Sequence, residues 1–169
     1  SALAAAMTAA GMPKDATKES IIAVLRSVDP QGYFKSRLVG RTSFNLFKTA
    51  QYLVNEARAD TTDPLKKAFT LLDKHHEVMP FHAGEIYLEV LTAMLYADFD
   101  FVRTMQFLIN YGRDNDTTAA VAGGILGAFY GFDRLPADKS KVIKVGLEDL
   151  DINLEALAQQ MTRRIIHLN

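Results

Sequence analysis

The chain has 169 residues, of which 49% are hydrophobic, and this composition suits one folded domain and excludes a disordered chain. Its 19 basic and 20 acidic residues are interspersed and give a net charge of −1, so we expect neither nucleic acid nor a membrane as a partner. The absence of cysteine excludes disulfides and thiolate metal sites and fits a reducing compartment such as the cytoplasm.

Apolar residues recur at helical spacing along nearly the whole chain. The expected helices cover residues 2–10, 17–28, 41–58, 64–75 and 84–97, a short segment from Asp100, most of 112–131, and 151–167. Asp63 and Pro64 suit the cap and the first position of the fourth helix. The helix over 84–97 is apolar on most sides and should be central. Only residues 141–145 hint at an extended segment, so the sequence predicts an all-α fold.

The stretch GRDNDTTAAVAGGILGAFYG, from Gly112 to Gly131, combines oxygen donors with a helix of small residues. Asp114, Asp116 and Thr117 stand where this helix should begin, and such hard oxygens suit a hard divalent cation. Asp114 or Asp116 can also cap the helix by accepting backbone N–H bonds, where the helix dipole favours negative charge. A metal site is therefore the first hypothesis, and a well-capped helix without a metal is the alternative.

Glycines recur every four residues in the body of this helix, at Gly123, Gly127 and Gly131. Each interior glycine costs about 1 kcal/mol relative to alanine, which indicates that something requires the bare backbone. Close approach of another helix is the usual reason. We therefore expect a rigid, buried helix that supports the site.

The same stretch resembles the C-terminal metal motif of the ADP-ribosylglycohydrolase (crystallin J1) family, which is Gly-Gly-Asp-x-Asp-Thr followed by an Ala/Gly-rich helix ending in Tyr-Gly. The resemblance implies an orthogonal helical bundle with a centre of two Mg²⁺ ions, for which Asp114, Asp116 and Thr117 would supply ligands. It also implies a hydrolase that removes ADP-ribose from a modified protein side chain or a small acceptor. The expected partner is thus an ADP-ribosylated protein or an ADP-ribose conjugate.

Two departures from the family pattern matter. Arg113 replaces a glycine, and its long cation could clamp a phosphate or narrow access, so Gly112 and Arg113 are candidate substrate-binding residues. The family's other metal ligands, in a Thr-Asp-Asp cluster and an acidic Gly-Asp segment, and its glycine-rich phosphate loop have no counterpart here. Because the chain also opens inside an alanine-rich helix pattern without an initiator methionine, we expect the C-terminal half of a longer protein.

In this interpretation, residues 1–169 form one all-helical domain or the C-terminal part of one, and 31–75 are a possible lineage-specific insertion. The N-terminal half of the same protein would be a partner that supplies the catalytic carboxylate. The alternative is a non-catalytic helical protein of the same fold that acts in binding or structure, as the lens crystallin relatives do.

Glu85, Glu89 and Thr92 form a polar stripe on the otherwise apolar helix over 84–97. Two carboxylates at this spacing can face one metal ion, but the Glu-x-x-His motif of di-iron bundles is absent, so we favour a solvated stripe. His75 and His76 are adjacent and point apart, which favours surface positions for both.

His82 precedes the same helix and either caps it or lines a cleft. Arg37 and Arg41 are spaced to share a helix face and to bind phosphate, although an exposed structural role is favoured. A nucleophilic triad is not supported, because no serine stands in a Gly-x-Ser-x-Gly setting.

Overall fold

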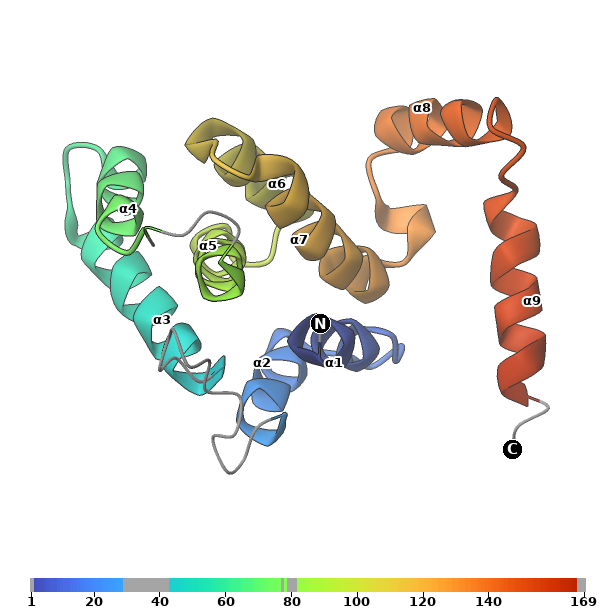
Figure 1. The fold of residues 1–169 in the computed structure, drawn as a ribbon, viewed down its shortest axis with the longest axis horizontal. Helices are drawn as coiled ribbons and strands as arrows, with labels where there is room; N and C mark the ends of the chain where they lie inside the picture. The colour runs from blue at the N-terminus through green and yellow to red at the C-terminus, as the bar shows by residue number, and fades with distance from the viewer. Residues whose placement is uncertain (1, 29–42, 77, 79–81, 167–169) are drawn as a thin grey trace. The chain divides into compact units, whose positions relative to one another are not determined.

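The structure is a computed structural model that describes residues 2–28, 43–76, 78 and 82–166 (Figure 1). All regular structure in these ranges is helical, which confirms the predicted all-α class. The first seven helices are α1 (Ala2–Gly11), α2 (Lys18–Ser27), α3 (Ser43–Ala59), α4 (Pro64–Asp73), α5 (Ala83–Tyr96), α6 (Phe101–Tyr111) and α7 (Asn115–Tyr130). None of the helices in the described ranges is long and apolar enough to cross a bilayer.

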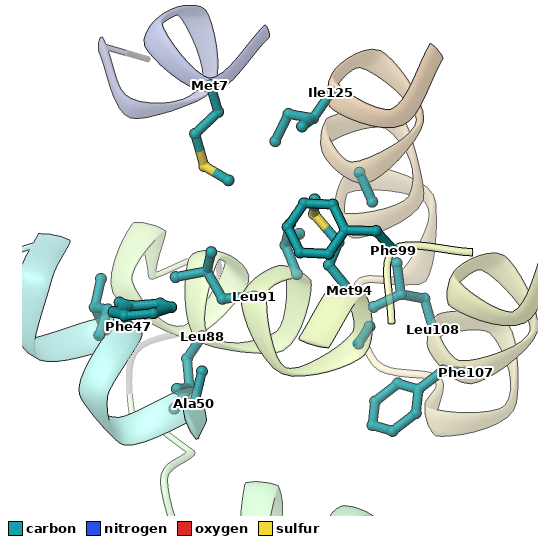
Figure 2. Packing of buried hydrophobic residues seen from close by; sticks show 14 of the residues in the cluster. Met7, Phe47, Ala50, Leu88, Leu91, Met94, Phe99, Phe107, Leu108 and Ile125 are labelled. Atoms are coloured by element: carbon teal, nitrogen blue, oxygen red, sulfur yellow. The ribbon is translucent and has the colours of Figure 1, made fainter. Parts of the chain in front are cut away.

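Residues Ser1–Gly131 form one compact unit, with α5 at its centre. Helices α3, α6 and α7 pack on α5, while α1 packs on α7 and α2, and α4 packs on α3. Figure 2 shows Leu88, Leu91 and Met94 of α5 among core side chains from the surrounding helices. The predicted central position of this helix is therefore confirmed.

Side-chain caps fix where several helices begin. The Asp63 carboxylate accepts a hydrogen bond from the Lys66 N–H at 3.0 Å, and Pro64 opens α4, as the sequence predicts. The Nδ1 atom of His82 accepts from the Gly84 N–H at 3.1 Å, so the capping alternative for this histidine is confirmed. A cap such as that of Asp63 stabilises its helix by about 1 kcal/mol.

Residues Phe132–Asn169 form a second unit. It contains a 3-10 turn (Phe132–Arg134), α8 (Ala137–Glu148) and α9 (Leu154–Ile166), and Lys144 bonds Glu155 at 2.8 Å. Residues 141–145, which only hinted at an extended segment, lie inside α8, as the all-α prediction requires. A short apolar run with β-branched residues does not distinguish a strand from a helix. Here the run lies in the middle of α8, which begins directly after Pro136.

The segment 31–75, predicted as a possible insertion, is described only from residue 43 onward. Arg37 and Arg41, the candidate phosphate ligands, lie outside the described residues. Phe47 and Ala50 of α3 and Leu72 of α4 are buried in the core of the first unit. The described part of the segment therefore supports the helices that carry the site, and its origin as an insertion stays a prediction.

Candidate functional site

Three residues, Gly112 to Asp114, connect α6 to α7. The Gly112 N–H donates to the carbonyl oxygen of Leu108 at 3.1 Å and closes α6. Gly112 has a φ of 86° and Arg113 a φ of 52°, so both residues lie in the left-handed region. An arginine in this conformation costs on the order of 1 kcal/mol relative to glycine, so Arg113 is a strained residue beside the predicted ligands.

Asp114 is the N-cap residue of α7, and Asp116 and Thr117 lie in its first turn. The Asp114 carboxylate makes no capping hydrogen bond, so the expected capping role was wrong for this residue. Its φ of −86° and ψ of 56° depart from the extended geometry that directs a cap side chain toward the helix. The carboxylate of Asp114 is thus not used by the first turn, and its convergence with Asp116 and Thr117 on a cation stays a prediction.

The glycines of α7 do not serve the expected close approach. A Cβ added at Gly124 or Gly127 would meet no atom within 4 Å, and one at Gly123 would make an ordinary 3.7 Å contact with Met105. The close approach occurs instead at Gly11 of α1, where a Cβ would lie 3.2 Å from the Phe129 backbone nitrogen. The bare backbone that the packing requires is therefore on the neighbouring helix, and the glycine face of α7 is open in the described residues.

The polar stripe of α5 is buried, so the expectation that it is solvated was wrong. Glu85 exposes 7% of its surface and Glu89 exposes 3%, while Thr92 is fully buried. The Thr92 hydroxyl donates to the carbonyl oxygen of Leu88 at 2.7 Å and needs no other partner. The carboxylates are buried because α3, α6 and α7 pack around α5.

Arg113 forms an ion pair with Glu85, with 2.5 Å between Nη2 and Oε1. The arginine side chain is 38% exposed and reaches inward from the surface to the carboxylate, which is 9% exposed. Burial alone would lower the pKa of Arg113, but the hydrogen bond and charge of Glu85 raise it above its usual value. Substrate binding by Gly112 and Arg113 stays a prediction, and in this structure the guanidinium is engaged with a protein carboxylate.

A tyrosine that sequence reasoning missed links α6 to the end of α4. The Tyr111 hydroxyl donates to Asp73 Oδ1 at 3.2 Å and is hydrogen-bonded to His76 Nε2, which lies 3.4 Å from the same oxygen. Burial, followed by the charges of Glu89 and Asp73, raises the pKa of Tyr111, so the phenol stays protonated. His76 is half-buried, with 26% of its side chain exposed, so it is less accessible than the expected surface position.

Glu89 is the most unusual group of the site. Its Oε2 atom is buried and has no hydrogen-bond partner among the residues that the structure describes. Burial and the neighbouring charge of Glu85 raise the pKa of Glu89 to about 7, Arg113 opposes this shift, and Asp114 adds to it. Burial is the largest of these effects and the charge of Asp114 the smallest.

His76, Glu85 and Glu89 each offer one ligand atom, and these atoms all lie within 4.8 Å of one another. The fold and this arrangement define an all-helical protein with a buried acidic cluster beside the Asp-x-Asp-Thr turn.

Comparison with known proteins identifies the family. A sequence profile described as ADP-ribosylglycohydrolase matches residues 1–167, so this chain belongs to the ADP-ribosylglycohydrolase family. It is similar to ADP-ribosylhydrolase ARH3 of Homo sapiens, with 40% identity over 55 residues, which are 32% of this chain and 15% of the relative. The matched region is thus a small part of that relative's length. No solved structure was found to match the chain.

Proposed function

We propose that this chain supplies the C-terminal metal ligands of a Mg²⁺-dependent hydrolase that removes ADP-ribose from a modified protein side chain or a small acceptor. The observation that carries the proposal is the family match across residues 1–167, together with the position of Asp114, Asp116 and Thr117 at the start of α7. ADP-ribosylhydrolase ARH3, by its name, acts on an ADP-ribose linkage, and the proposal extends that chemistry to this chain.

The donor set fits a hard cation. Asp116 is exposed, and Asp114 and Thr117 are half-buried, so their oxygens can be reached from solvent. The Asp114 carboxylate is not used as a helix cap, and the N-terminus of a helix also directs backbone N–H groups toward an anionic ligand. When bound, Mg²⁺ would orient the ribose hydroxyls and activate a water molecule.

Arg113 is the positively charged side chain next to the proposed magnesium ligands. Its ion pair with buried Glu85 directs the guanidinium toward α5, next to the magnesium ligands proposed at the start of α7. This chain would therefore hold the ions with Asp114, Asp116 and Thr117, while Arg113 neutralises the carboxylate behind them. The general acid or base would come from the N-terminal half of the protein, so the 169 residues alone would be inactive.

The test is release of ADP-ribose by the complete protein with Mg²⁺. Asp116→Ala should lower kcat/KM by about 100-fold or more, because a catalytic metal contributes several kcal/mol to the transition state. Asp138→Ala is the matched control, because Asp138 is also an exposed aspartate in the first turn of a helix and lies in the second unit. Unchanged turnover in Asp116→Ala would exclude the assigned role.

The second candidate is a non-catalytic binding or structural protein of the same fold. The strained Arg113 and its ion pair favour it, because they place a cation where the family pattern has glycine. Calorimetry of the complete protein with ADP-ribose and Mg²⁺ separates the candidates. Binding of both ligands supports the hydrolase, and binding of neither supports the non-catalytic protein.

A further inference from the structure

We propose that His76, Glu85 and Glu89 form a separate site for a transition-metal ion, with Zn²⁺ as the best match. His76 follows α4, Glu85 and Glu89 lie on α5, and none of the three belongs to the Asp-x-Asp-Thr turn. Metal binding at this cluster can therefore be tested without ADP-ribose and separately from the hydrolase function proposed above.

The distances between the ligand atoms are close to those around a bound metal ion. Because the three atoms lie within 4.8 Å of one another, a point between them is no more than about 2.8 Å from each. Zinc–nitrogen and zinc–oxygen bonds are about 2.0–2.2 Å long. Each ligand atom would thus move inward by less than about 1 Å. Side-chain rotation can supply such a movement without a change of the backbone.

The unpartnered oxygen of Glu89 points independently to a missing ligand. Glu89 is 97% buried, since it exposes 3% of its surface, and its Oε2 accepts no hydrogen bond. A buried acceptor without a partner costs about 1–3 kcal/mol, and more when the group is charged. A cation bound between the two glutamates would satisfy this oxygen, which no donor among the described residues does.

The chemistry of the ligands selects the metal. Mg²⁺ prefers oxygen ligands and water, whereas an imidazole with carboxylates suits Zn²⁺ and similar transition-metal ions. The hydrogen bond from the Tyr111 hydroxyl to Asp73, and the contacts of both groups with His76, restrain the imidazole next to the two glutamates. Such partners of a ligating histidine fix its orientation and strengthen metal binding.

Arg113 competes with the metal ion for Glu85. Its guanidinium donates to that carboxylate and would have to leave when a cation binds. The arginine side chain is 38% exposed, so it can turn into solvent without crossing the core. The metal-free protein therefore has Arg113 as an internal counterion, and removal of this side chain should strengthen metal binding.

The test is calorimetric titration of the full chain with ZnCl₂ and, separately, MgCl₂, with circular dichroism to confirm the fold of each variant. Zn²⁺ should bind with one-to-one stoichiometry and at least about tenfold more tightly than Mg²⁺. His76→Ala and Glu89→Gln should each weaken Zn²⁺ binding by about tenfold or more. Arg113→Gly, which suits the left-handed backbone, should strengthen it by roughly tenfold, because a charge-assisted hydrogen bond no longer has to be broken.

His75→Ala is the matched control, since His75 is the adjacent, partly buried histidine outside the cluster. It should leave Zn²⁺ binding unchanged. If Glu89→Gln fails to fold, the more exposed His76→Ala still decides the question. Absence of Zn²⁺ binding, or Zn²⁺ binding that survives His76→Ala, would overturn the proposal.

Discussion

The open glycine face of α7 predicts that alanine there makes the protein more stable. Gly124 and Gly127 have helical backbone, and a Cβ at either position would meet no atom within 4 Å. Replacement by alanine therefore gains helix propensity, about 1 kcal/mol for each residue, without a steric penalty. The double variant should gain about 2 kcal/mol if the two effects add.

Gly11→Ala is the counterpart, because it makes the same chemical change where the structure leaves no room. Its Cβ would lie 3.2 Å from the Phe129 nitrogen and 3.4 Å from the Ile125 carbonyl oxygen, and both are backbone atoms of α7. Moving a helix backbone to relieve such overpacking costs about 1–3 kcal/mol. This variant should therefore be less stable than the wild type.

Urea denaturation followed by circular dichroism measures these differences as shifts of the transition midpoint, provided that the slope with urea stays constant. A gain in the α7 variants together with a loss in Gly11→Ala would agree with the packing described. Destabilisation by Gly127→Ala would refute the reasoning, because it would mean that another surface packs on this face of α7.

Three further outcomes follow from single contacts. Asp63→Ala should lower the free energy of unfolding by about 1 kcal/mol in urea denaturation, because the Lys66 N–H loses its cap; no change would show that the cap contributes nothing. In metal-free buffer, the free energy of unfolding should fall by about 3 kcal/mol as the pH rises from 4.5 to 7. The reason is that folding raises the pKa of Glu89 from 4.5 to about 7, so the unfolded chain loses this proton at a lower pH than the folded protein does. Glu89→Gln should remove this decrease, and an identical pH profile in the variant would contradict the assignment. Tyr111→Phe should cost about 1 kcal/mol in thermal or urea unfolding through the hydrogen bond to Asp73, and a neutral result would argue against that bond.

Local patterns in the sequence were sufficient to predict most of the helices. The Asp63–Pro64 start of α4 is set by residues adjacent in the chain, so the sequence could predict it. The hint of an extended segment at 141–145 was misleading because β-branched residues favour strands only weakly, and a short run carries little information about its partners. The glycines of α7 were misinterpreted for a related reason, since spacing alone does not tell which of two helices needs the bare backbone.

The buried cluster was harder to predict, although one signal for it was present. A helix that is apolar on most sides and central to the fold leaves few solvated positions, and this favours burial of Glu85 and Glu89 over exposure. The ion pair with Arg113 and the approach of His76 depend on how α4, α5 and the turn before α7 meet, and no local pattern contains that information.

The short turn between α6 and α7 limits how this protein can be altered or labelled. Both ends of the turn are anchored in helices that pack against the same core, so even one additional amino acid would shift the acidic side chains relative to the glutamates beneath them. Affinity tags, fluorescent probes and permuted termini are better placed at the polar bend around Thr61, between α3 and α4. This turn should thus tolerate substitutions far better than insertions or deletions.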